Sequence, residues 1–67
     1  MDDWIKVYSS AQVYKCNILK AVLDEYNIAY RELNKKDSSY VFMGEMEIYV
    51  PAADEIFARL LITQNKL

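Results

Sequence analysis

The chain has 67 residues, with 8 Lys and Arg against 10 Asp and Glu, a net charge of −2, no histidine and one cysteine. This length accommodates one small domain over residues 1–67, and the missing histidines remove the commonest general base and metal ligand. One cysteine forms neither an internal disulfide nor a four-ligand zinc site. We therefore expect a protein that is not an enzyme and that holds no metal and no cofactor.

Charge and hydropathy also restrict the partners and the location. The slightly acidic chain lacks a long basic run, which disfavours nucleic acid because neutralisation of phosphates supplies most of that affinity. Its apolar runs have four residues or fewer, whereas a bilayer span needs about 20. A lone thiol is typical of a reducing compartment, and no signal-peptide pattern opens the chain. We expect a cytoplasmic protein that contacts neither nucleic acid nor a membrane.

Residues 4–9 alternate in polarity and are rich in β-branched and aromatic side chains, a pattern that predicts a strand. Ile5 and Val7 are expected to face the core. The side chains expected on the opposite face are those of Trp4, Lys6 and Tyr8.

A helix is predicted over residues 11–26, with Ser9 and Ser10 supplying its N-cap. Asn27 tolerates a left-handed backbone and is expected to end this helix. The expected apolar stripe, which recurs at helical spacing, consists of Tyr14, Ile18, Leu19, Val22, Leu23 and Tyr26.

Residues 28–33 predict a second strand, followed by a polar loop over residues 34–39. The inward side of this strand is left open between two sets, which are Ile28 with Tyr30 and Ala29 with Leu33.

Residues 45–50 predict a third strand, which Pro51 ends because it has no amide proton for the ladder. Its alternation places Met46, Ile48 and Val50 inward and Glu45, Glu47 and Tyr49 outward. Whether residues 40–43 extend this strand or form a separate hairpin arm is left open.

A second helix follows, because Asp54 and Glu55 suit the positive end of a helix dipole. Glu55 is placed to pair with Arg59 one turn later. The apolar stripe expected for this helix consists of Ala53, Ile56, Phe57, Leu60, Leu61 and Gln64.

The order strand, helix, strand, strand, helix predicts an α+β, ferredoxin-like fold, which is the split βαβ arrangement without its last strand. A right-handed crossover makes the first two strands parallel, and the short loop makes the second and third antiparallel. The third strand is therefore expected between the other two, with both helices on one face of the sheet.

One end of this sheet is a candidate anion site, and a small-anion or nucleotide sensor is the alternative function. The third strand starts where the first two end, so residues 34–44 are expected beside the N-terminus of the first helix. Amides, hydroxyls and ammonium groups there suit a phosphate or carboxylate. The candidate residues are Ser9, Ser10, Lys35, Lys36, Ser38 and Ser39. The opposing interpretation is that the serines only cap the helix and the loop is solvated.

The uncovered face of the sheet is a candidate partner interface. Exposed aromatic side chains on a small domain usually mark a surface that another molecule covers. The candidates are Trp4, Tyr8 and Tyr49 on this face, with Tyr40 and Phe42 from the preceding loop region. Its glutamates disfavour RNA, so a partner protein or a second copy is expected. The opposing interpretation is that long Lys and Glu side chains cover the rings.

Cys16 lies beside the apolar stripe of the first helix. A cysteine in such a place is expected to be a partly buried, inert thiol. A redox role would need a cation that lowers the thiol pKa, for which Lys15 and Lys20 are the candidates.

Four strings, WIKVYSS, KAVLDEYNI, LNKKDSSY and EMEIYVP, occur in this order. Through them residues 4–61 resemble a family of small bacterial domains described as putative prokaryotic signal-transducing proteins. The resemblance implies a ferredoxin-like α+β fold akin to PII-type nitrogen regulators, whose effector loop joins the second and third strands. Residues 35–43 occupy that place here, which implies a recognition element. The chain is much shorter than PII proteins and lacks their nucleotide-binding segments, so ATP binding is not implied.

Overall fold

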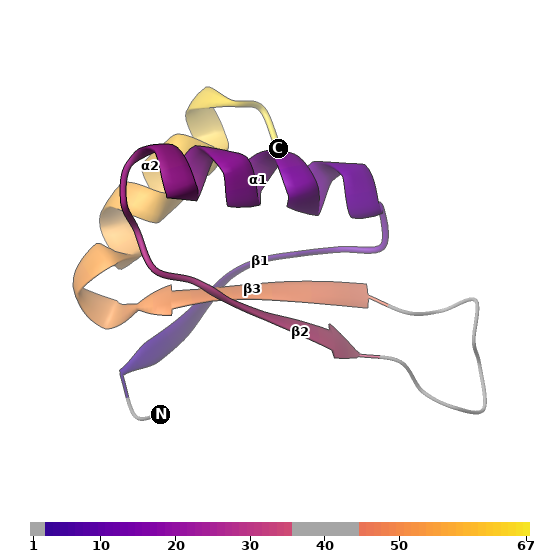
Figure 1. Ribbon diagram of the computed structural model, residues 1–67, viewed down its shortest axis with the longest axis horizontal. Coiled ribbons are helices and arrows are strands. Elements are labelled where there is room, and N and C mark those ends of the chain that lie inside the picture. The colour runs from indigo at the N-terminus through magenta and orange to yellow at the C-terminus, as the bar shows by residue number, and fades with distance from the viewer. Residues whose placement is uncertain (1–2, 36–44) are drawn as a thin grey trace.

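The computed structural model describes residues 3–35 and 45–67 of the chain. In chain order the elements are β1 (Trp4–Ser10), α1 (Val13–Glu25), β2 (Arg31–Lys35), β3 (Glu45–Pro51), the short 3₁₀ helix η2 (Ala52–Asp54) and α2 (Glu55–Gln64). Figure 1 shows the strands as one layer, with α1 and α2 on the same side of it. The α+β, ferredoxin-like βαββα fold is therefore confirmed. The question about residues 40–43 lies outside the described residues.

Strand β3 lies at the centre of the sheet, in the order β1-β3-β2, and is antiparallel to both neighbours. This arrangement confirms the predicted topology. Ile48 of β3 is opposite Tyr8 of β1 and Glu32 of β2. Because directly opposite residues share a face of the sheet, these pairs fix which side chains face the helices.

The core lies between the sheet and the two helices. Ile48 and Val50 are completely buried, and Met46 packs against them from the same strand, as the alternation predicts. Of the two sets considered for the second strand, Ile28 with Tyr30 faces the core, whereas Leu33 is exposed. The buried apolar side chains are those of Val7, Cys16, Leu19, Leu23, Ile28, Ile48, Val50, Ala58 and Leu61.

The predicted stripe is wrong in half of its members for α1 and in most of them for the second helix. In α1, Leu19 and Leu23 are buried as expected, but Tyr14, Ile18 and Tyr26 are exposed. In α2, Leu61 is buried as expected. The exposed members of its stripe are Ala53, Ile56, Phe57, Leu60 and Gln64.

Small side chains explain this rotation of both helices. Cys16 of α1 and Ala58 of α2 are fully buried, and small residues let a helix backbone approach its neighbours closely. Periodicity reports that a helix has an apolar stripe, but both helices carry apolar residues on more than one side. Close packing then decides which side the sheet covers.

A β-bulge in β1 corrects the predicted position of Tyr8. The register passes from Lys6 opposite Tyr49 to Tyr8 opposite Ile48, so Val7 is the extra residue. A bulge inserts one residue and shifts the alternation beyond it. Val7 is buried and Tyr8 packs against the same core. Tyr8 therefore lies on the helix side of the sheet, and not on the uncovered face.

The start of α1 also differs from the prediction. Strand β1 continues through Ser10, and the N-cap of α1 is Gln12. The Ser10 hydroxyl oxygen accepts a hydrogen bond from the Gln12 amide at 3.0 Å. This bond is a local serine turn, so neither Ser9 nor Ser10 caps the helix.

The end of α1 is a Schellman motif, in which a left-handed residue lets the next amides reach back to the last carbonyls. Asn27 has the positive φ of 59° that the sequence predicts for the stop. The Ile28 amide donates to the Leu23 carbonyl at 2.9 Å, and the Asn27 amide donates to the Asp24 carbonyl at 3.1 Å. Because Ile28 is held in this cap, β2 begins only at Arg31.

The end of α2 repeats this motif. Lys66 has a φ of 56°, the Leu67 amide donates to the Ile62 carbonyl, and the Lys66 amide donates to the Thr63 carbonyl, both at 3.1 Å. Leu67 and Ile62 both pack against the core. Each helix end therefore returns the next apolar side chain to the core, as Ile28 does after α1.

The left-handed position of Asn27 makes a testable prediction about stability. We expect Asn27→Ala to lower the free energy of unfolding by about 1 kcal/mol, because a Cβ clashes in the left-handed region and alanine lacks the compensating amide. Asn27→Gly, the matched control, is expected to stay within about 0.5 kcal/mol of the wild type. Urea denaturation followed by circular dichroism measures both. Equal stability of the two variants would contradict the role of Asn27 as a left-handed stop.

Candidate functional site

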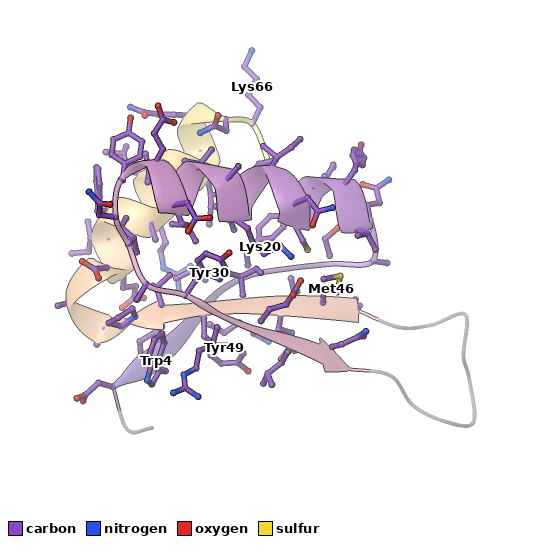
Figure 2. The ribbon with its side chains drawn as sticks, viewed as in Figure 1. Trp4, Lys20, Tyr30, Met46, Tyr49 and Lys66 are labelled. Carbon is purple, nitrogen blue, oxygen red and sulfur yellow. The ribbon has the colours of Figure 1, made fainter. Side chains whose placement is uncertain are left out.

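The side of the sheet away from the helices carries a hollow of about 420 Å³. We call this side the open face, and its side chains include those of Trp4, Lys6, Arg31, Leu33, Glu47 and Tyr49. Figure 2 shows Trp4 and Tyr49 below the sheet, whereas Tyr30 and Lys20 lie between the sheet and the helices. The residues that line the hollow are Trp4, Arg31, Glu32, Leu33 and Tyr49.

Arg31 is the cation of this hollow. Its guanidinium carbon lies 4.8 Å from the centroid of the Trp4 ring, within the range of a cation–π contact. In the pairing of β2 with β3, Arg31 is directly opposite Tyr49. Within the part of the chain that the structure describes, no carboxylate forms an ion pair with Arg31. The guanidinium is therefore held in place by an aromatic ring while its donors face the hollow and the solvent.

Glu47 is a buried carboxylate at the centre of the open face. It points away from the helices as predicted, but only 4% of its surface is exposed. The Tyr49 hydroxyl donates to Glu47 Oε1 at 2.9 Å, and Lys6 Nζ lies 3.5 Å from Glu47 Oε2. A buried charge is tolerated when it is hydrogen-bonded and paired. Glu47 thus fixes the positions of Lys6 and Tyr49.

The hydrogen bond to Glu47 raises the pKa of the Tyr49 phenol above its ordinary value. Partial desolvation and the negative charge of Glu47 add to this effect, and the Lys6 ammonium opposes it. The neutral phenol is the form that donates the bond, so Tyr49 remains a donor at physiological pH.

Sequence reasoning found two of the residues in the hollow, Trp4 and Tyr49. It placed Tyr8 there wrongly, and the candidates Tyr40 and Phe42 lie outside the described residues. It missed Arg31 and Leu33, because the inward side of the second strand was left open. The signal was present, since Arg31 and Leu33 alternate with Tyr30 and Glu32.

The predicted anion site is only partly described. Ser9 is opposite Glu47 and Ser10 is opposite Met46, so the two serines lie on opposite faces of the sheet. The Ser10 oxygen already accepts the Gln12 amide. Lys36, Ser38 and Ser39 lie outside the described residues, and for Lys35 only the backbone is described. The anion site stays a prediction.

The side chains of Glu32 and Cys16 lie on the helix side of the sheet, although Glu32, on the edge strand β2, also borders the hollow. Lys20 of α1 binds Glu32 at 3.1 Å, which ties the helix to the edge strand. Burial raises the pKa of the Cys16 thiol, the Glu32 charge raises it further, and Lys20 acts in the opposite direction. The thiol is fully buried and protonated at neutral pH, which is the inert state expected from the sequence.

The described ranges contain neither a metal-ligand cluster nor a membrane-spanning helix. Among residues 3–35 and 45–67, no three His, Cys, Asp or Glu side chains gather closely enough to hold a metal ion. Over the same residues, neither helix has the length and apolar character of a membrane span.

The raised pKa of Tyr49 makes stability depend on pH at the alkaline end. The folded state disfavours the phenolate, so the stabilisation is complete below the unfolded pKa of about 10 and is lost as the pH rises through the folded pKa. We expect the stability difference between wild type and Tyr49→Phe to be constant from pH 7 to about 9 and to shrink above that. Urea denaturation across this range measures it. If the free energies of unfolding of wild type and Tyr49→Phe differ by the same amount at every pH up to 11, the Tyr49–Glu47 hydrogen bond is contradicted.

The burial of Cys16 predicts a slow thiol. We expect Ellman's reagent to react with the folded protein at least about a hundredfold more slowly than with the urea-unfolded chain, because modification needs local opening. The unfolded chain serves as the control for intrinsic reactivity. Similar rates in both states would contradict a buried, protonated thiol.

A comparison with known families gives one result. The family described as "Putative prokaryotic signal transducing protein" matches residues 4–66. No curated protein and no solved structure matched the chain. The match covers β1, both helices and the whole sheet, and with it the open face. The chain therefore belongs to the family described as putative prokaryotic signal transducing proteins.

Proposed function

We propose that this chain is a non-enzymatic, cytoplasmic signal-transducing module that binds a partner protein through the hollow of the open face. The observation that carries this proposal is Arg31 stacked on Trp4 in an uncovered hollow. The family description supports a role in signalling. The buried free thiol of Cys16 is compatible with a reducing compartment.

The chemistry of the hollow indicates the kind of partner. Arg31 presents a planar set of donors that matches a carboxylate. Leu33, 50% exposed, and the rings of Trp4 and Tyr49 supply apolar surface beside it. Aromatic residues and arginine are the types that most often contribute large binding energies at interfaces. We infer a partner segment that presents an acidic side chain next to an apolar one.

The side chains of this surface are already ordered in the absence of a partner. Glu47 positions Tyr49 and Lys6 through a hydrogen bond and an ion pair, and the Trp4 ring positions Arg31. Side chains that are already ordered lose less conformational entropy on binding. The segment after β2, where PII-type proteins carry an effector loop, belongs to the proposal as a second contact by resemblance only.

Trp4 gives a direct test, because it is the only tryptophan of the chain. Immobilised protein is used to capture partners from a bacterial lysate, and each captured protein is then purified and titrated while Trp4 emission is recorded. We expect Arg31→Glu to weaken binding at least about tenfold, because it replaces the cation of the hollow with a negative charge.

Arg59→Glu is the matched control, since Arg59 is an exposed arginine of α2 that does not line the hollow. Its side chain pairs with Glu55 and donates to the Lys6 backbone carbonyl at 3.4 Å. We expect this variant to bind within about twofold of the wild type. Circular dichroism and thermal melting verify that both variants fold. Equal affinity of Arg31→Glu and the wild type, or binding without any change in Trp4 emission, would contradict binding in the hollow. A thermal shift with inorganic phosphate that Arg31→Glu leaves unchanged would instead favour the anion sensor.

A further inference from the structure

The outer side of the helix layer carries a large apolar patch that the core does not use. We call it the helix patch, and its members are Tyr14, Ile18, Tyr26, Ile56, Phe57 and Leu60. Their exposed fractions range from 41% for Phe57 to 84% for Ile56. These side chains belong to the stripes that periodicity assigns to the core, so the sequence contains more helical apolar surface than one copy buries.

The patch is continuous across both helices. The rings of Tyr26 and Phe57 meet edge to face, with centroids 5.3 Å apart and an interplanar angle of 81°. Tyr14 and Ile18 are one helical turn apart on α1, as Ile56 and Leu60 are on α2, and residues at this spacing stack on one side of a helix. Both helices lie on the same side of the sheet (Figure 1), so the patch faces away from the open face.

The size of the patch is that of a protein interface. With full side-chain areas of about 200 Å² each, the exposed fractions of these six residues amount to roughly 650 Å². A stable interface buries about 800 Å² on each partner, whereas the largest apolar patch of a typical monomer is about 300–600 Å². An exposed Ile56 alone needs no explanation, but a continuous patch of this size does.

The order of residues along α1 indicates what covers the patch. Lys15 lies near the start of the helix and Glu25 at its end, and within the described residues neither forms an ion pair. If a second α1 lies antiparallel with its centre also at residue 20, Lys15 of each copy meets Glu25 of the other. The same register places Tyr14 against Tyr26 and Ile18 against Val22.

We propose that two copies of this chain associate through the helix patch, with their α1 helices antiparallel about a two-fold axis near residue 20. A two-fold interface uses the same surface on both copies, so each contact occurs twice. Ala21, which is exposed one residue from this centre, leaves room for the helices to approach. A small domain buries little apolar surface in its own core. The partner copy then buries apolar surface that the core of one copy leaves exposed. Both open faces remain accessible in this dimer.

Sedimentation equilibrium and light scattering test the proposal. We expect the wild type to have twice the monomer mass of 7.9 kDa and Ile18→Glu to weaken the dimer at least about a hundredfold, because it places a charge in the apolar centre. Val13→Glu is the matched control, since Val13 is an exposed aliphatic residue of the same helix outside the patch. It is expected to remain dimeric. A monomeric wild type at millimolar concentration, or equal effects of the two variants, would overturn the proposal.

Charge reversal tests the antiparallel register and also provides variants that keep the patch intact. We expect Lys15→Glu and Glu25→Lys each to raise the dissociation constant of the dimer about tenfold, since each interface then holds two like-charge pairs. The double variant Lys15→Glu/Glu25→Lys is expected to return within about threefold of the wild type. Absence of this rescue would overturn the register. Arg31→Glu is expected to leave the dimer unchanged, so this result is independent of the partner binding proposed above.

Discussion

The pairing of β3 on both of its edges is the constraint on which the rest of the structure depends. A central strand satisfies its backbone hydrogen bonds on both sides, and its alternating side chains divide the molecule into two surfaces. Ile48 and Val50 lie beneath both helices and close the core. Glu47 and Tyr49 project from the same strand to the opposite side. One seven-residue strand therefore contributes side chains both to the core and to the open face.

The buried carboxylate of Glu47 shows how the open face is organised. A charge with 4% exposure is stable only when donors surround it, and Tyr49 and Lys6 supply them. The bond orients the Tyr49 phenol toward Glu47, and the Lys6 side chain, which stays 51% exposed, reaches the carboxylate from the solvent side. Arg31, stacked on Trp4, completes a surface in which charged and aromatic groups hold one another in place. Such order before binding is what a recognition surface needs.

The open face and the helix patch lie on opposite sides of the molecule, with the sheet and the core between them. Cys16 and Ala58 are small enough for α1 and α2 to lie close to the sheet. Leu19, Leu23 and Leu61 are buried beside them, and the side chains of the helix patch stay outside. A folded chain of 67 residues buries a limited share of its surface. The apolar surface that remains outside is available for association. The molecule thus has two faces of different chemistry, one polar and aromatic, the other apolar.

The sequence alone determined the order of the elements, the central position of β3, the left-handed stop at Asn27 and the family, because these depend on local periodicity, turn chemistry and short strings of residues. It also assigned Trp4 and Tyr49 to the same face of the sheet. Only the tertiary structure decided which side of each helix is buried, since both helices are apolar on more than one side and Cys16 and Ala58 set the contact. It also decided the positions of Tyr8 and Arg31. A single inserted residue at Val7 reverses the alternation of β1, and no local pattern reports that shift because it arises from pairing with a distant strand.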